Sequence, residues 1–120
     1  MPKDFKLGRT VFDDKIVSIK KVTSFDLTTK DTHYIDASKL PKDAKWRVRK
    51  NGDVFTKFGS GEKKLKDYMI DKKIPNSVRD SIPLLANETE VFCVLGYEIS
   101  DKVKITDKTK KAYAITYKNK

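Results

Sequence analysis

The sequence predicts an α+β fold: one compact single domain with a mixed or mostly antiparallel sheet and two short helices. Three observations lead to this prediction. Short runs of β-branched and aromatic residues recur along the chain between Gly, Asn and Asp residues, which is typical of strands and turns. Helical periodicity is confined to the stretch between Gly61 and Pro83. A chain of 120 residues has the size of one domain with one hydrophobic core.

The first third of the chain reads as β-structure. Thr10–Phe12 and Ile16–Val22 are apolar and β-branched on either side of Asp13-Asp14-Lys15, which predicts a hairpin with an acidic turn. A further short strand is expected over Thr32–Asp36. The best internal boundary, Pro41-Lys42-Asp43, is too short to be a linker between independent domains. We therefore treat residues 1–42 as a β-rich lead-in to the main part of the domain, residues 43–120.

A strand beginning at Trp46 carries alternating side chains. Trp46 and Val48 are expected to point to one side, so that Arg47 and Arg49 stand together on the solvent face. A turn at residues 51–53 follows, in which Gly52 can adopt a positive φ. One interpretation is that this turn directs Arg47, Arg49 and Lys50 at a phosphate backbone. The alternative is a solvated edge strand whose cations prevent edge-to-edge pairing.

A first helix is expected from Glu62 to about Lys72, with a buried stripe that includes Leu65, Tyr68 and Met69. The helical arrangement of the lysines divides them between two exposed faces. One face holds Lys64 with Asp67 and Asp71, where ion pairing is expected to offset the lysine's charge. The other face holds Lys63, Lys66 and Lys73, which are therefore the better phosphate candidates.

The rest of the chain reads as one more short helix and several strands. Pro75 ends the first helix, and Asn76 or Ser77 caps a second helix that carries Arg79 and ends before Pro83. Cys93 is expected to be buried and inert, because it stands alone within an apolar run. The strands predicted after Pro83 are Leu84–Leu85, Val91–Leu95, Val103–Ile105 and Ala112–Tyr117.

Positive charge is concentrated in one part of the chain. Of the formal net charge of +10, the segment from Lys45 to Arg79 contributes +7, because it holds eleven Lys or Arg against four Asp or Glu. A surface with this much charge favours a polyanionic partner, and phosphate is the commonest polyanion.

The sequence offers little for catalysis, metal binding or membrane insertion. His33 is the single histidine and has no second ligand at metal spacing, so a structural role is expected for it. No nucleophile signature is present. No apolar run approaches the roughly 20 residues of a membrane span, and the polar start lacks a signal-peptide apolar region. We therefore expect a soluble, cytoplasmic binding module with no membrane contact and with no catalytic residue, cofactor or metal of its own.

A series of residues with ordered spacing carries a family resemblance. The series begins with two arginines and a Gly-Asp turn and ends with two short proline-bounded motifs. It resembles the C-terminal domain of bacterial tRNA(Ile)-lysidine synthetase, and looser similarity extends it over roughly the last ninety residues. The matching positions are Arg47, Arg49, Gly52-Asp53, Phe55, Lys63-Lys64-Leu65-Lys66-Asp67, Lys72-Lys73-Ile74-Pro75, Arg79-Asp80 and Ile82-Pro83.

The resemblance implies a function for this chain within a larger enzyme. The family uses ATP to join lysine to the wobble cytidine of tRNA, in an N-terminal domain with an S-G-G-x-D-S loop that this sequence lacks. The chain would then be the separated C-terminal part of a longer polypeptide, and ATP would bind only the missing catalytic domain. By resemblance, this chain would be a tRNA-binding accessory that grips the acceptor-stem side, and its partners would be tRNA and the catalytic domain of the same polypeptide.

We therefore expect the basic residues of this region to contact RNA. A different class of function also remains open, in which the chain is a protein-interaction or scaffolding module that docks an acidic domain through its basic face. The predicted RNA-binding residues are Arg47, Arg49, Lys50, Lys63, Lys64, Lys66, Lys73 and Arg79.

Overall fold

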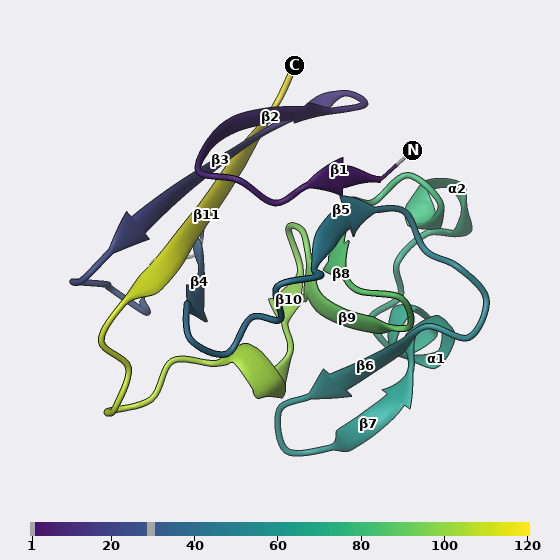
Figure 1. Cartoon of the computed structure of the whole chain (residues 1–120). Coiled ribbons are helices and arrows are strands. Elements are labelled where there is room, and N and C mark those ends of the chain that lie inside the picture. The colour runs from purple at the N-terminus through teal and green to yellow at the C-terminus, as the bar shows by residue number, and fades with distance from the viewer. Residues whose placement is uncertain (1, 29–30) are drawn as a thin grey trace.

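The computed structural model describes residues 2–28 and 31–120, and its elements form three layers. A smaller sheet lies on one side, a larger sheet lies in the middle, and two short helices lie on the other side of the larger sheet (Figure 1). This arrangement confirms the predicted α+β class with mixed sheets and two short helices. The division of the strands between two sheets was not predicted.

The larger sheet contains both parallel and antiparallel neighbours. Its order is β1-β5-β8-β9-β6-β7, and β10 also pairs with β9. The pairing of β6 with β9 is parallel, and the other pairings in this sheet are antiparallel. Its strands are β1 (Lys3–Asp4), β5 (Lys45–Arg47), β6 (Val54–Lys57), β7 (Gly61–Lys64), β8 (Leu84–Ala86), β9 (Glu90–Val94) and β10 (Glu98–Ile99).

The smaller sheet has the order β2-β3-β11-β4 and is antiparallel throughout. The predicted N-terminal hairpin is confirmed, since β2 and β3 pair directly and Asp13 occupies their turn with a φ of 54°. The predicted fourth strand around Tyr34 is confirmed as well. The strands are β2 (Gly8–Phe12), β3 (Lys15–Val22), β4 (His33–Asp36) and β11 (Ala112–Asn119).

The helices are shorter than the sequence suggested. α1 spans Leu65–Asp71 and α2 spans Asn76–Arg79. The expected helix start at Glu62 is wrong, because residues 61–64 pair with β6 as a strand. The expected strand at Val103–Ile105 is also wrong, since Val103 ends a 3-10 turn, η1 (Asp101–Val103), and residues 104–105 belong to no strand. In the part of the chain that the structure describes, no helix is long and apolar enough to cross a membrane.

Both faces of the larger sheet are buried at its central strands. On β8, Leu85 joins the core between the two sheets, while Leu84 and Ala86 join the core beneath the helices. Trp46 of β5 also faces the core between the sheets. Because adjacent residues of a strand point to opposite faces, both positions of such a strand enter an interior. Cys93 is buried in the same core as Trp46, as predicted.

The turn between β9 and β10 helps to join the two sheets. The backbone N–H of Gly96 donates to Nε2 of His33 on β4 at 3.0 Å. The side chain of Tyr117 on β11 lies over Gly96, where an added Cβ would come within 2.7 Å of the tyrosine hydroxyl. His33 thus has the structural role expected of it. Burial lowers the pKa of His33, which keeps Nε2 unprotonated and able to accept this hydrogen bond.

We predict that acidification weakens the contact between the sheets. The folded-state pKa of His33 lies below its unfolded value of about 6.5. The unfolded chain therefore binds more protons at this site between these two pKa values. The stabilisation is complete above about pH 6.5 and declines as the pH falls toward the folded-state pKa. Thermal unfolding at pH 7.5 and pH 5.5 should show a lower midpoint at the acidic pH.

The variant His33→Gln provides the control, because glutamine offers an acceptor oxygen without titrating. Its midpoint should change less between the two pH values than that of the parent chain. Equal changes in both proteins would show that His33 does not cause the pH dependence.

Candidate nucleic-acid interface

Arg47 is buried and fully engaged inside the protein. Its side chain is 7% exposed and pairs with the carboxylate of Asp53, at 2.9 Å from Nη1 to Oδ2 and 2.8 Å from Nη2 to Oδ1. Nη1 also donates to the carbonyl of Val48, and both Nε and Nη2 donate to the carbonyl of Asn87. These five bonds use the five N–H donors of a guanidinium group. No donor remains for a phosphate.

The expected exposed pair of Arg47 and Arg49 is therefore wrong. Trp46 and Arg47 do lie on opposite sides of β5, but the strand ends at Arg47, so the expected alternation does not extend to Val48 and Arg49. The error concerns the second face, which is interior rather than solvent because residues 48–53 and Asn87 enclose the guanidinium. Arg47 was predicted to bind RNA, and its geometry instead gives it a structural role beneath the interface.

Asp53 connects the turn after β5 to the start of α1. In addition to Arg47, its Oδ2 accepts the backbone N–H of Lys50 at 2.8 Å. Its backbone carbonyl accepts the N–H of Leu65, the first residue of α1, at 2.9 Å. The buried ion pair thus fixes the turn at residues 50–53 against residues 64–66. We call Arg47 with Asp53 the buried clamp.

The two segments held by the buried clamp enclose a groove of about 450 Å³. Four cationic side chains line it, and all four belong to the predicted set. Arg49 and Lys50 come from the turn after β5, whereas Lys64 and Lys66 come from the β7–α1 junction. Residues that are far apart in sequence are thereby brought to one surface. We call this surface, formed by Arg49, Lys50, Lys64 and Lys66, the basic groove.

The cations of the basic groove differ in how they are neutralised. Arg49 donates from Nε to Asp80 at 2.7 Å, and the side chain of Asp80 is 81% exposed. Lys50 lies 3.5 Å from Glu88, which is also well exposed. Within residues 2–28 and 31–120, neither Lys64 nor Lys66 forms an ion pair. Exposed ion pairs contribute little free energy, so these cations can exchange their carboxylates for phosphates.

The ion pairing expected for Lys64 is made by Lys63 instead. Both residues belong to β7, where successive side chains point to opposite faces. Lys63 lies opposite Phe55 in the register and forms an ion pair with Asp71 of α1. That hydrogen bond lowers the pKa of the Asp71 carboxyl. Lys64 faces the basic groove instead, so the lysine that had been assigned an acidic neighbour is the one without an ion pair among the described residues.

The two remaining predicted residues lie outside the basic groove. Lys73 follows α1 in an exposed position with a φ of 58°. Arg79 is half-buried and donates from Nε to the carbonyl of Ile74 at 2.7 Å, which ties α2 back to the end of α1. Their roles as RNA contacts stay predictions.

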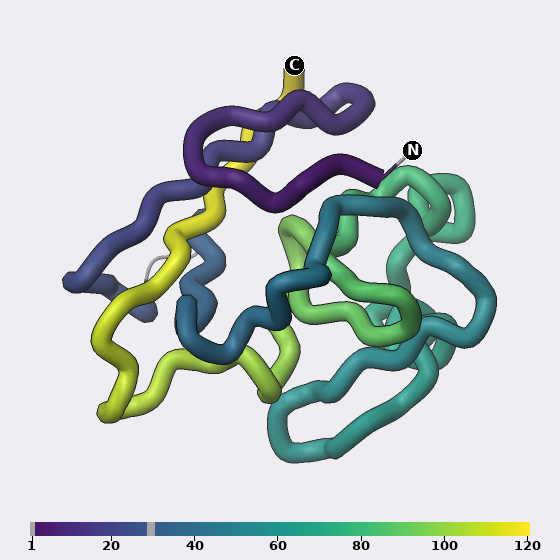
Figure 2. The backbone as a smooth tube through the Cα atoms, viewed as in Figure 1, coloured from purple at the N-terminus to yellow at the C-terminus, as the bar shows by residue number. Residues whose placement is uncertain are grey.

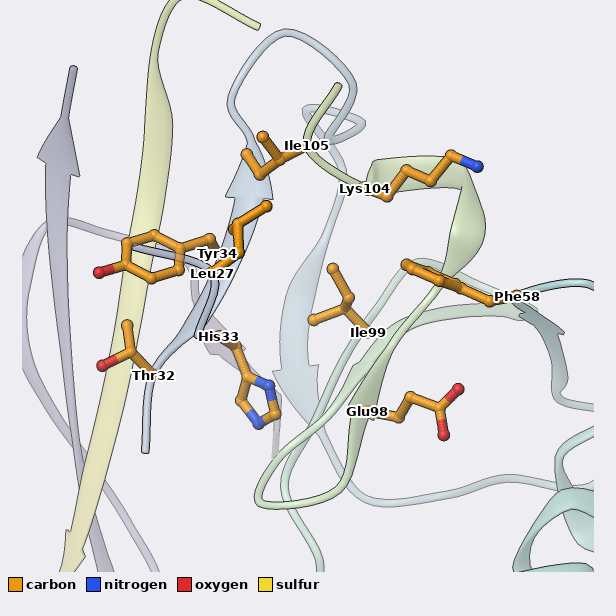
Figure 3. A pocket seen from close by; sticks show the side chains of 9 residues that line it. All are labelled: Leu27, Thr32, His33, Tyr34, Phe58, Glu98, Ile99, Lys104 and Ile105. Atoms are coloured by element: carbon orange, nitrogen blue, oxygen red, sulfur yellow. The ribbon is translucent and has the colours of Figure 1, made fainter. Parts of the chain in front are cut away.

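A second, more apolar pocket contains His33 and Glu98. Its volume is about 260 Å³, and Figure 3 shows His33, Ile99 and Glu98 on its wall. The Nε2 of His33 accepts the N–H of Gly96. Glu98 accepts a hydrogen bond from the hydroxyl of Tyr68 and lies 3.2 Å from Nζ of Lys72. His33 and Glu98 are thus engaged in contacts with other parts of the fold.

Metal ligands are not gathered in the described residues either. In those residues no group of three or more His, Cys, Asp or Glu side chains could hold a metal ion. Phe55 is fully buried against Tyr68, with ring centroids 4.6 Å apart.

The sequence analysis missed two participants at this site. Asp53 was seen only as a turn former, although it holds the turn in place through Arg47. Asp80 was not recognised as the counter-ion of Arg49, which lies 31 positions away. The Arg-x5-Asp spacing across a tight turn is a signal for the first contact, whereas only tertiary structure reveals the second.

Comparisons with known proteins agree on one family. The family model described as the TilS substrate C-terminal domain matches residues 44–115. The tRNA(Ile)-lysidine synthase of Clostridium tetani is 41% identical over 111 residues, covering 88% of this chain and 24% of that protein. The tRNA(Ile)-lysidine synthase of Caldanaerobacter subterraneus subsp. tengcongensis is 36% identical over 107 residues, covering 88% and 23%. This chain therefore spans about a quarter of the length of these relatives.

A solved structure shows the same fold. The crystal structure of a TILS C-terminal domain superimposes with a TM-score of 0.82 at 18% identity, covering 99% of this chain and 96% of the other. The resemblance inferred from the sequence is thereby confirmed.

We predict that mutation of Arg47 destabilises the fold much more than mutation of Arg49. Arg47→Ala leaves the carboxylate of Asp53 buried without its ionic partner, so the free energy of unfolding should fall by about 3–5 kcal/mol. Arg49→Ala breaks an exposed pair and should cost at most about 1 kcal/mol. Chemical denaturation of both variants measures the difference. Similar costs would show that the buried clamp is not the stabilising contact.

Proposed function

Because the chain belongs to the TilS substrate C-terminal domain family, we propose that it is the accessory tRNA-binding part of a tRNA(Ile)-lysidine synthase. The observation that carries this proposal is the convergence of Arg49, Lys50, Lys64 and Lys66 on one groove. Its ligand is the phosphate backbone of a tRNA stem.

The groove suits a polyanion better than it suits a small molecule. Its four cations meet two exposed carboxylates, Asp80 beside Arg49 and Glu88 beside Lys50, while Asp53 is held within the buried clamp. Lysine and arginine at such a surface displace the counterions condensed on the nucleic acid, and this release drives binding. The two lysines without ion pairs among the described residues lose no internal contact when they bind a phosphate.

The mode of recognition follows from the shape of RNA. An A-form stem presents a shallow minor groove between two phosphate ridges, and proteins read it mostly by shape and by phosphate and 2′-hydroxyl contacts. The cations of the basic groove come from a turn and a helix start that the buried clamp holds together. A rigid cationic surface of this kind grips a stem without selecting its sequence.

This chain covers about a quarter of the length of its relatives, so its function is part of a larger one. In this proposal the remainder of the polypeptide binds ATP and attaches lysine to the wobble cytidine. The domain described here holds the tRNA on its acceptor-stem side during that reaction. Its own residues contribute to tRNA affinity and not to the chemical step.

We predict that the lysines of the basic groove set part of the salt dependence of tRNA binding. If the four cations neutralise four phosphates, the groove contributes about −3 to −4 to the slope of log K against log salt. Lys64→Gln combined with Lys66→Gln should reduce the magnitude of the slope by about 2, because each lysine that contacts phosphate contributes about 1. Fluorescence anisotropy with labelled tRNA at several salt concentrations measures this change.

The matched control is Lys6→Gln with Lys120→Gln, which removes the same charge away from the groove. The control should keep the parent slope, and both variants should retain the parent unfolding midpoint. If the groove variant behaves like the control, the groove does not hold tRNA. If the parent chain binds an acidic protein domain as tightly as tRNA, a protein-docking function is favoured instead.

A further inference from the structure

A second concave cationic surface lies on the opposite side of the molecule from the basic groove. Lys21, Lys108, Lys110 and Lys111 line a hollow of about 400 Å³ at the end of the smaller sheet. The loop that leads into β11 and the loop between β5 and β6 lie at opposite sides of the fold (Figures 1 and 2). We call these four residues the lysine hollow.

The fold gathers these lysines from two distant segments. Lys21 lies opposite Tyr113 in the register of β3 and β11, so that the side chains of both residues share one face. The loop at residues 106–111 is fixed against β4 by a hydrogen bond of 2.7 Å from Thr109 to the carboxylate of Asp36. The N–H of Ala37 donates to the carbonyl of Lys111 at 3.0 Å. The lysines are thus presented on a braced loop.

The positive charge of the lysine hollow is not neutralised within the part of the chain that the structure describes. None of its four lysines forms an ion pair there. The carboxylate of the hollow belongs to Asp36, which is buried and accepts hydrogen bonds from Ser38 and Thr109. Its ionic neighbour is Lys39 at 3.9 Å, which is not one of the four. Fewer of the hollow's cations form ion pairs than those of the basic groove, where Arg49 and Lys50 each have a carboxylate partner.

The composition of the lysine hollow favours RNA over a protein partner. Lysine is depleted at protein interfaces, whose cores are built from aromatic and other apolar side chains. The hollow offers one aromatic side chain, Tyr113, which is half-buried and packs edge-on against Phe5 with ring centroids 4.9 Å apart. Contacts to nucleic-acid phosphates, in contrast, come mainly from lysine and arginine.

We propose that the lysine hollow binds the phosphate backbone of RNA at a segment other than the one held by the basic groove. The choice of RNA rests on the proposed function, whereas the site itself does not. The domain measures 36 × 33 × 27 Å and carries the two surfaces at opposite sides. A straight stem along one face reaches only one of them, so a single RNA that contacts both must fold around the domain.

The test is the salt dependence of tRNA binding by the 120-residue chain with Lys108→Gln, Lys110→Gln and Lys111→Gln combined. The magnitude of the slope of log K against log salt should fall by about 2 to 3, at roughly 0.9 per phosphate contact. The control variant, with Lys15→Gln, Lys118→Gln and Lys120→Gln, loses the same charge at the other end of the smaller sheet and should keep the parent slope. Lys118 and Lys120 lie toward the far end of β11 from Lys111, beyond the reach of the hollow.

A second variant tests the lysine that β3 contributes to the hollow. Lys21→Gln alone, on β3, should reduce the slope by about 1. Unchanged slopes in both hollow variants would overturn the proposal, as would an equal change in the control. Thermal unfolding identifies any variant that fails to fold, and Lys21→Gln still decides the outcome if the triple variant is lost.

The two proposals fail in distinguishable ways. If the hollow variants weaken tRNA binding while Lys64→Gln with Lys66→Gln does not, the hollow is an RNA site and the basic groove is not. If only the groove variant weakens binding, the lysine hollow has no RNA role. If both sites bind RNA, a variant that combines the groove and hollow substitutions should show a reduction in slope equal to the sum of the two separate reductions.

Discussion

The buried ion pair between Arg47 and Asp53 is the contact on which the architecture of the basic groove depends. Arg47 is the last residue of β5, and its partner Asp53 accepts the backbone N–H of Lys50 across the turn. The backbone carbonyl of Asp53 also accepts the N–H of the first residue of α1. A pair of charges that is removed from water this completely is stable only if its hydrogen-bonding groups are satisfied. The five bonds of the Arg47 guanidinium meet that requirement. The rigidity of the groove is therefore a consequence of an interior contact.

The three-layer arrangement gives Arg47 and Arg49 different environments. Because the larger sheet is buried on both faces, a cation at the end of β5 can be enclosed, whereas a cation two residues later emerges beside α2. Arg47 holds the scaffold, and Arg49 is placed where a ligand can reach it. The same principle applies to β7, where Lys63 joins α1 through Asp71 and Lys64 faces the groove.

Much of the fold could be predicted from local sequence. The apolar and β-branched runs on either side of Asp13 predicted the hairpin correctly, and the spacing of Leu65, Tyr68 and Met69 predicted the buried side of α1. The start of α1 could not be predicted, because pairing of residues 61–64 with β6 overrides their helical pattern. Alternation on a strand also shows which residues lie on opposite faces, but it does not show whether the second face meets water.

The sequence predicted several residues of the candidate site, but it did not predict the contacts that each of them makes. Four of the eight predicted residues meet at the basic groove, because the charge-rich segment folds back on itself. Arg47 and Lys63 were assigned the wrong surroundings, since their partners depend on tertiary contacts with Asp53 and Asp71. The lysine hollow was missed because its cations come from β3 and from the loop before β11, which meet only through the register of the smaller sheet.

In the proposed function, RNA occupies the basic groove while Arg47 stays enclosed in the buried clamp. Titration of the isotope-labelled chain with a short RNA duplex, followed by NMR, observes both parts of the site at once. We expect the backbone amides at residues 49–53 and 64–66 to shift, and the Arg47 Nε–H resonance to stay protected from exchange with water. Unshifted amides in both segments, or an Arg47 resonance that exchanges freely once RNA binds, would contradict this expectation.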